Sequence, residues 1–173
     1  EQLFEPGKNY LYVDVGGGST EINLISEGEL KSSRSYNIGT VRMLSGMVKN
    51  EEKEQMHTDL EVLAKEYAPI HIIGSGGNIN KLFRLADKKD KKQLFLPLAS
   101  LQDIYRTLKD LPKEQRIKLF KLKPDRADVI VPAAEIFMEV ATRVQANGII
   151  VPTIGLSDGI IDSLYTKNRQ WMQ

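Results

Sequence analysis

The feature that most constrains this chain is a run of three glycines between two strand-like segments, in YLYVDVGGGSTEINLIS at residues 10–26. The residues before the glycines are β-branched and aromatic, which is typical of a buried strand. After them, Ile22 and Leu24 alternate with Glu21 and Asn23, and this period of two predicts a second strand. The glycines therefore form a hairpin loop. With a turn at 27–28 and a third strand at 29–38, the sequence predicts an antiparallel meander.

Two familiar glycine-rich phosphate loops are excluded by this pattern. A Walker loop requires Gly-Lys-Ser/Thr at the start of a helix, whereas Gly18 is followed by Ser19, Thr20 and a strand. A dinucleotide-binding fingerprint requires a third glycine where Glu21 stands, and again a helix after it. The chain therefore belongs to neither of these nucleotide-binding classes.

The hairpin loop still has the composition of an anion site. Glycine N–H groups without a neighbouring Cβ can form a concave nest around an oxyanion, and two hydroxyls add donors. The carboxylates of Asp14 and Glu21 flank the loop, and hard carboxylates beside a phosphate suit hydrated Mg²⁺. A tight turn that merely requires glycine is the alternative. The polar residues around the turn favour a functional site, for which the candidates are Asp14, Gly16, Gly17, Gly18, Ser19, Thr20 and Glu21.

A second glycine loop, GSGGN at residues 74–78, follows a predicted strand and opens a predicted helix. The N–H groups and dipole at a helix start favour an anion, so the second set of phosphate-binding candidates is Gly74, Ser75, Gly76, Gly77 and Asn78. One such loop is weak evidence. Two in one small sheet form the pattern of the actin, Hsp70 and sugar-kinase superfamily.

The remaining periodicity predicts helices that cover a mixed sheet. They span residues 50–67 with Asn50 as the cap, 100–111 with a Ser100/Asp103 capping box, 113–122, and 125–147 with a kink at Pro132 and Gly148 as the C-cap. A strand at 148–154 and a short helix from Ser157 follow. No repeat or linker interrupts the pattern. We therefore expect a single α/β domain, 1–173, whose mixed β-sheet carries the antiparallel hairpin meander.

Composition sets outer bounds on function. The 24 Lys and Arg against 23 Asp and Glu give a net charge of +1, which does not indicate DNA or a membrane surface as partner. The absence of cysteine excludes disulfides and thiolate metal sites and fits a cytoplasmic location. His57 and His71 lack companion ligands at metal spacing, so we interpret both as surface or packed residues.

Five segments resemble the exopolyphosphatase / guanosine pentaphosphate phosphohydrolase (Ppx/GppA) family in order and approximate spacing. They span nearly the whole chain and read YVDVGGGSTEINLISEGEL, SRSYNIGTVRM, IIGSGGNINKL, RADVIVPAAEIF and GLSDGIIDSLY. The resemblance implies an actin-like ATPase (ribonuclease H-like) lobe and a Mg²⁺-dependent phosphohydrolase acting on polyphosphate or guanosine penta/tetraphosphate such as pppGpp. It makes Asp14 and Glu21 the acidic, metal-side catalytic residues. It implies that residues 16–20 hold phosphate and that residues 74–78 line the other side of the cleft.

The chain departs from that family in several places. Asn78 stands where the family often has Thr, and Ser157-Asp158 stands where Arg-Glu is common. The family also has a first lobe with its own phosphate loop and an upstream catalytic glutamate, and only 13 residues precede Asp14 here. We therefore expect this chain to be the second lobe of a two-lobed enzyme, with its own first lobe as partner, and to be inactive alone. Homodimer formation stays open.

Two other functions use the same loops. A non-catalytic sensor would bind a nucleotide or an alarmone with these loops and would need no catalytic base upstream. A kinase of the same superfamily would transfer the phosphate to an acceptor. The basic residues at 88–92 and 113–123 could guide polyphosphate, although most such runs are solvated faces. Arg126 and Asp128 match the family, and an ion pair at a helix end explains them equally well.

Overall fold

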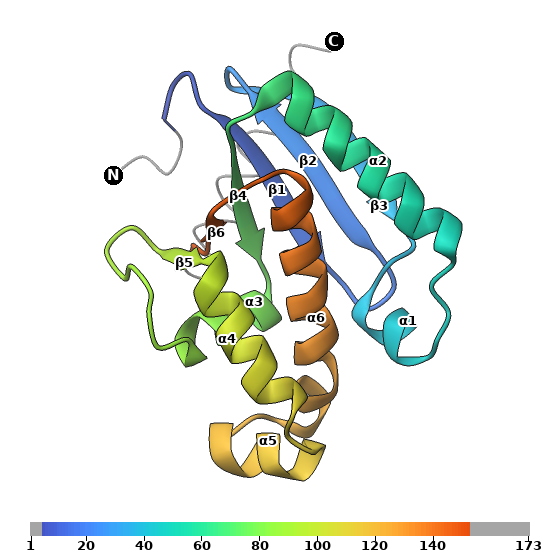
Figure 1. The fold of residues 1–173 in the computed structure, drawn as a ribbon, viewed down its shortest axis with the longest axis vertical. Helices are drawn as coiled ribbons and strands as arrows, with labels where there is room; N and C mark the ends of the chain where they lie inside the picture. Colours follow the sequence, from blue (N-terminus) through green and yellow to red (C-terminus); the bar gives the residue numbers. More distant parts are fainter. Residues whose placement is uncertain (1–4, 153–173) are drawn as a thin grey trace.

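The computed structural model describes residues 5–152, which form one six-stranded sheet with helices against it (Figure 1). The strand order is β3-β2-β1-β4-β6-β5. The strands are β1 (Asn9–Val15), β2 (Thr20–Ser26), β3 (Glu29–Tyr36), β4 (Ile70–Ser75), β5 (Phe95–Pro97) and β6 (Gly148–Ile150). β1, β2 and β3 pair antiparallel, whereas β1, β4 and β6 run parallel, so the predicted mixed sheet with its hairpin meander is confirmed.

The helices pack on one face of the sheet because alternate strand residues on that face are apolar. They are α1 (Thr40–Leu44), α2 (Asn50–Tyr67), α3 (Gly77–Leu85), α4 (Leu98–Lys109), α5 (Lys113–Phe120) and α6 (Pro124–Arg143). Leu11 and Val13 of β1 and Ile22 and Leu24 of β2 join one buried cluster with Phe137 of α6. The opposite face carries Tyr10, Tyr12, Ile25 and Ile73, so each strand contributes to both faces.

Several predicted helix ends are corrected by the structure. α4 begins at Leu98 after Pro97, so Ser100 lies inside the helix, 8% exposed, and does not form the predicted capping box. Leu98, the first helical residue, packs against the buried cluster, so the helix starts two residues before the capping signal. In α2, Asn50 is the first helical residue and Lys49 is the cap, without a side-chain hydrogen bond.

The end of α6 was also predicted wrongly. The helix runs through Pro132 to Arg143, and Gly148 begins β6 instead of capping the helix. The short elements α1 and β5 were not predicted, because each has too few residues to show a period. The predicted helix from Ser157 and the Ser157-Asp158 departure lie outside the described residues.

The carboxyl ends of β1 and β4, the start of α3 and the start of α6 all lie in the lower half of Figure 1, near α1 and above α5. Because β1 and β4 are parallel neighbours, Asp14 and Ser75 are paired in register just before the two glycine loops. This topology brings the two loops together at one edge of the sheet. Within residues 5–152, none of the helices combines the length and apolar character that crossing a membrane requires.

Candidate functional site

Hydrogen bonds from α1 fix the triple-glycine loop on one side. The backbone N–H of Thr40 donates to the Gly16 carbonyl at 3.0 Å, and those of Val41 and Arg42 donate to the Gly17 carbonyl at 3.0 and 3.1 Å. The Arg42 side chain adds a bond from Nε to the Gly18 carbonyl at 2.8 Å. Three successive carbonyl oxygens of the loop therefore point toward α1.

The direction of these carbonyls determines where the loop's N–H groups point. A trans peptide places the carbonyl of one residue opposite the N–H of the next, so the N–H groups of Gly17, Gly18 and Ser19 point away from α1. Among the described residues none of these three N–H groups has an acceptor, whereas the Gly16 N–H closes the turn on the Ser19 carbonyl at 2.9 Å. Three neighbouring donors without acceptors among the described residues have the arrangement that an anion nest requires, and phosphate binding there stays a prediction.

Gly39 makes this arrangement possible. A Cβ at Gly39 would lie 2.3 Å from the Gly17 carbonyl oxygen and 2.6 Å from the Gly18 carbonyl carbon. No side chain fits in that space, so a glycine is required for α1 to approach the loop. The sequence analysis missed Gly39, α1 and Arg42. Their only sequence signal was the segment NIGTVRM, which was noted for its resemblance and not for a contact.

The two candidate carboxylates lie side by side on the sheet. Asp14 and Glu21 are paired across β1 and β2, and the same row continues to Ser75 on β4 and Ser35 on β3. Side chains directly opposite each other on one face have Cβ atoms about 4.5–5.5 Å apart. Glu21 Oε1 accepts hydrogen bonds from Ser19 Oγ at 3.1 Å and from Ser35 Oγ at 2.9 Å, which orients its carboxylate.

These two carboxylates fit the requirements of Mg²⁺. Mg²⁺ is usually bound through one or two carboxylates together with oxygens of the substrate phosphate, and it keeps several waters. Asp14 is exposed and Glu21 is half-buried, so solvent reaches the pair. Asp14 and Glu21 are therefore the residues that would hold a hydrated ion beside the loop.

The hydroxyls near the first loop are already engaged within the protein. Thr20 is fully buried and its Oγ1 donates to the Ile38 carbonyl at 2.6 Å. The Ser19 hydroxyl donates to Glu21, as described above. The loop therefore presents backbone N–H groups, and the two hydroxyls form hydrogen bonds that fix the loop to the surrounding structure. Their predicted contact with phosphate stays a prediction.

The second loop combines a packed beginning with an exposed end. Ser75 is 8% exposed and its hydroxyl shares a hydrogen bond with the Tyr12 hydroxyl. Gly76 has φ 117°, a conformation that favours glycine, and it turns the chain so that α3 starts at Gly77. Gly76 and Gly77 are exposed and Asn78 is half-buried, so these three residues form the accessible part of the loop.

A Gly74→Ala substitution should test the packed part of this loop. The added Cβ would lie 2.8 Å from Phe137 Cε1 and 3.0 Å from Ile149 Cγ2, so we expect the free energy of unfolding to fall by about 1–3 kcal/mol. Denaturant unfolding measures the loss. Gly18→Ala is the matched control, since its Cβ would meet nothing closer than Arg42 Nη2 at 3.8 Å. Equal stability of the two variants would contradict the packing role.

Arg126 and Asp128, for which an ion pair at a helix end was one of two interpretations, do not pair with each other. Asp128 pairs with Lys113 at 2.8 Å, while Arg126 Nη1 donates to Asn78 Oδ1 at 2.6 Å. The start of α6 is thereby connected to the second glycine loop. The sequence analysis singled out Arg126 but did not place it at the site, because the two residues lie 48 positions apart.

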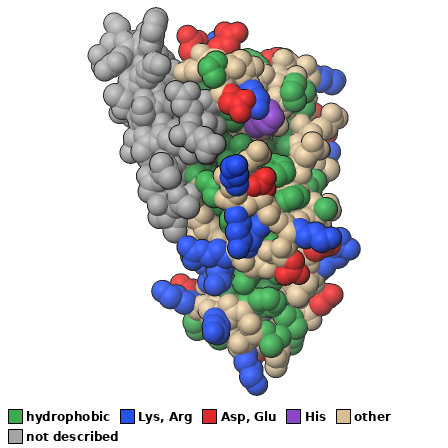
Figure 2. Space-filling model, turned by 90° about the vertical axis from the view of Figure 1, so that its left-hand side faces the viewer, with side chains coloured by type: hydrophobic (Ala, Val, Ile, Leu, Met, Phe, Trp, Pro, Cys, Tyr) green, Lys and Arg blue, Asp and Glu red, His purple; other side chains and the backbone are tan. Residues whose placement is uncertain are grey.

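Some members of the two basic runs have structural roles. Lys89 donates to the carbonyls of Phe83 and Arg84, both at 2.7 Å, and Arg116 donates to those of Leu108 and Ala127. Lys113 is half-buried and pairs with Asp128, and, apart from Lys89, the other lysines of the two runs are exposed. Figure 2 shows blue side chains over the middle and lower parts of one face, mixed with acidic ones. The runs are thus partly structural, and guidance of polyphosphate stays a prediction.

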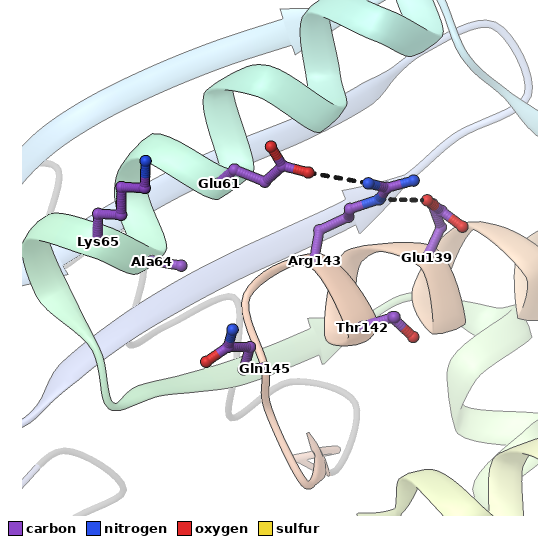
Figure 3. A pocket seen from close by; sticks show the side chains of 7 residues that line it. All are labelled: Glu61, Ala64, Lys65, Glu139, Thr142, Arg143 and Gln145. Carbon is purple, nitrogen blue, oxygen red and sulfur yellow. Dashed lines mark hydrogen bonds and ion pairs between the residues drawn. The ribbon is translucent and has the colours of Figure 1, made fainter.

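One hollow on the helical face lies away from the glycine loops. A cavity of about 500 Å³ between α2 and α6 is lined by Glu61, Lys65, Glu139, Arg143 and neighbours (Figure 3). Arg143 donates to Glu61 and Glu139, both at 2.8 Å. A rise of 1.5 Å per residue places Glu139 about 20 Å and Arg143 about 26 Å along α6 from Arg126. The hollow is therefore separate from the candidate site.

The two histidines also lie away from the loops. His57 Nε2 contacts Glu139 Oε1 at 2.8 Å, beside the hollow on the helical face. The His71 ring lies 5.8 Å from that of Tyr10 near the amino end of β4, and burial lowers the pKa of His71. Neither residue is placed to take part in chemistry at the glycine loops.

Residues 2–168 match the model of the Ppx/GppA phosphatase family. A curated relative, exopolyphosphatase 2 of Mycobacterium tuberculosis (strain CDC 1551 / Oshkosh), is 28% identical over 186 residues. The alignment covers 94% of this chain and 58% of that protein. The chain therefore spans less than two thirds of the relative's length.

Solved structures of family members also match this chain over only part of their own length. The Ppx/GppA family member of Aquifex aeolicus is 27% identical with a TM-score of 0.68, covering 94% of this chain and 57% of that chain. An exopolyphosphatase from Cytophaga hutchinsonii, 22% identical with a TM-score of 0.71, covers 91% and 57% and supports the fold alone. These neighbours have the actin-like ATPase fold, so the predicted fold class is confirmed.

Proposed function

Because the chain belongs to the Ppx/GppA phosphatase family, we propose that it is the second lobe of a Mg²⁺-dependent phosphohydrolase that releases terminal phosphate from polyphosphate or pppGpp. One observation carries the proposal. Three N–H groups of the glycine loop point away from α1, next to the paired carboxylates Asp14 and Glu21. The name of the curated relative, an exopolyphosphatase, supports polyphosphate as the substrate class.

The residues of this lobe would bind and polarise the terminal phosphate. The N–H groups of Gly17, Gly18 and Ser19 are preorganised donors for phosphoryl oxygens, whose charge is redistributed in the transition state. Asp14 and Glu21 would hold Mg²⁺, which when bound neutralises part of the phosphate charge. A general base that activates water is expected on the first lobe. The site therefore needs both lobes for turnover.

Substitution of the carboxylates in the full-length parent tests the proposal. Asp14→Asn and Glu21→Gln keep the size of each side chain and remove its charge, so phosphate release with Mg²⁺ should fall at least about a hundredfold. Glu29→Gln is the matched control, because Glu29 is an exposed carboxylate of β3 that pairs with Lys31 of the same strand. Release is measured with polyphosphate and with pppGpp as separate substrates.

The outcomes of this experiment are distinct. If the parent releases no phosphate from either substrate and Asp14→Asn changes nothing, the proposal is wrong. Saturable nucleotide binding without turnover would favour the sensor alternative. Transfer of phosphate to an acceptor, with no release to water, would favour a kinase.

A further inference from the structure

The two oxygens of the Glu21 carboxylate have different surroundings. Oε1 accepts one hydrogen bond from Ser19 Oγ at 3.1 Å and a second from Ser35 Oγ at 2.9 Å. Ser19 belongs to the triple-glycine loop, whereas Ser35 lies on β3, directly opposite Glu21 in the strand register. Among the described residues, no side chain donates a hydrogen bond to Oε2. The protein therefore engages one oxygen of this carboxylate and leaves the other for a ligand.

The two hydroxyl donors use the full capacity of Oε1. An ionised carboxylate has about four lone-pair sites, two on each oxygen. Ser19 and Ser35 occupy both sites of Oε1. A cation can approach Oε2 without disturbing these bonds, but it must displace one of the two hydroxyls before both oxygens can bind it. The hydrogen bonds therefore favour binding of a metal ion through a single oxygen of Glu21.

Mg²⁺ and Ca²⁺ differ in the carboxylate geometry that they accept. Mg²⁺ demands near-ideal octahedral coordination, which a carboxylate bound through both oxygens distorts, whereas Ca²⁺ takes about 6–8 oxygen ligands and readily uses both oxygens of one carboxylate. Within residues 5–152, no group of three or more His, Cys, Asp or Glu side chains is placed to hold a metal ion. The way in which Asp14 and Glu21 present their oxygens therefore determines much of what the protein offers to either ion.

We propose that Ser35 is a positioning residue that shifts the metal preference of this site toward Mg²⁺ and away from Ca²⁺, because its hydroxyl keeps Glu21 Oε1 occupied. This inference rests on the proposed function and adds a determinant of metal choice to it. Ser35 suits this role better than Ser19 does. Pairing of β3 with β2 fixes Ser35 beside Glu21, whereas Ser19 lies in the loop that would contact the phosphate. Ser35 acts through Glu21 and does not touch the ion.

The test compares the two metals on the ¹⁵N-labelled chain, with MgCl₂ alone or CaCl₂ alone as the probe. The amide shifts of residues 14–21 in an NMR titration give one dissociation constant for each ion. In Ser35→Ala the ratio of the Ca²⁺ constant to the Mg²⁺ constant should fall about tenfold, the usual effect of losing one hydrogen bond to a charged group. The fall is expected because Glu21 Oε1 then becomes available to Ca²⁺.

Two further variants separate positioning from a structural role. Ser35→Thr keeps a hydroxyl at this position and should keep the wild-type ratio. Ser33→Ala is the matched control, because Ser33 is an exposed serine of the same strand whose cross-strand neighbour is Asn23. It should also keep the wild-type ratio. The Tm without metal shows that each variant is folded. A merely structural role of Ser35 would weaken the binding of both ions equally and leave the ratio unchanged.

The outcomes distinguish this inference from the proposed function. If Mg²⁺ shifts residues 14–21 but the ratio is the same in Ser35→Ala as in the wild type, the inference is overturned and the metal site stands. A ratio that falls equally in Ser33→Ala also overturns it, because the effect would then not depend on the contact with Glu21. If neither ion at millimolar concentration shifts these amides in the wild type, the metal site of the proposed function fails and the inference fails with it.

Discussion

A Gly39→Ala variant of the full-length parent should lose at least about a hundredfold in the rate of phosphate release, the usual effect of losing preorganised donors to the transition state. The added Cβ would lie 2.3 Å from the Gly17 carbonyl oxygen, so the loop and α1 must move apart. That movement breaks the hydrogen bonds that turn the loop carbonyls toward α1. The N–H groups of Gly17, Gly18 and Ser19 would then no longer converge.

The Gly39 experiment needs a folding check and a control. Circular dichroism and the Tm show whether the variant is folded, and Ser45→Ala, at the exposed end of α1, should keep full activity. If Gly39→Ala does not fold, Arg42→Ala removes the 2.8 Å bond to the Gly18 carbonyl without adding volume. It should lower activity in the same direction by about tenfold, comparable to one hydrogen bond to a charged group. Full activity of a folded Gly39→Ala would refute the role of α1.

The isolated chain should fold, bind phosphate weakly and hydrolyse neither polyphosphate nor pppGpp measurably. As one lobe of two, it would present only part of the hydrogen-bond donors to the phosphate and could not exclude water from the site. Loss of general base assistance alone lowers rates about 10²–10⁴-fold, and loss of positioning lowers them further. The apolar cluster between the sheet and its helices is contained in this chain, so folding does not depend on another lobe.

Complementation tests this expectation directly. A single cooperative thermal transition, with phosphate release at the level of buffer, is the expected result for residues 1–173. Addition of the first lobe of the parent, in cis or in trans, should restore hydrolysis. Robust release by the isolated chain, abolished by Glu21→Gln, would show that the base lies within this chain.

The sequence by itself was sufficient for features that depend on neighbouring residues. Alternation at residues 21–24 correctly predicted that a strand follows the glycines, and this excluded two phosphate-binding folds. The apolar period predicted α2 over its full length, Asn50–Tyr67. The motif order identified the family. Local periodicity and the motifs reveal these features because each signal comes from residues that are close together in the sequence.

Only the tertiary structure decided which groups face the site. Gly39 meets Gly17 from 22 residues away, and Arg126 meets Asn78 from 48 away, so neither contact leaves a periodic signal. The Thr20 hydroxyl satisfies the buried Ile38 carbonyl. A polar group that is buried must find a partner, and the partner is chosen by packing between distant segments. The sequence therefore determined the loops and their order, and long-range packing determined which of their donors point outward.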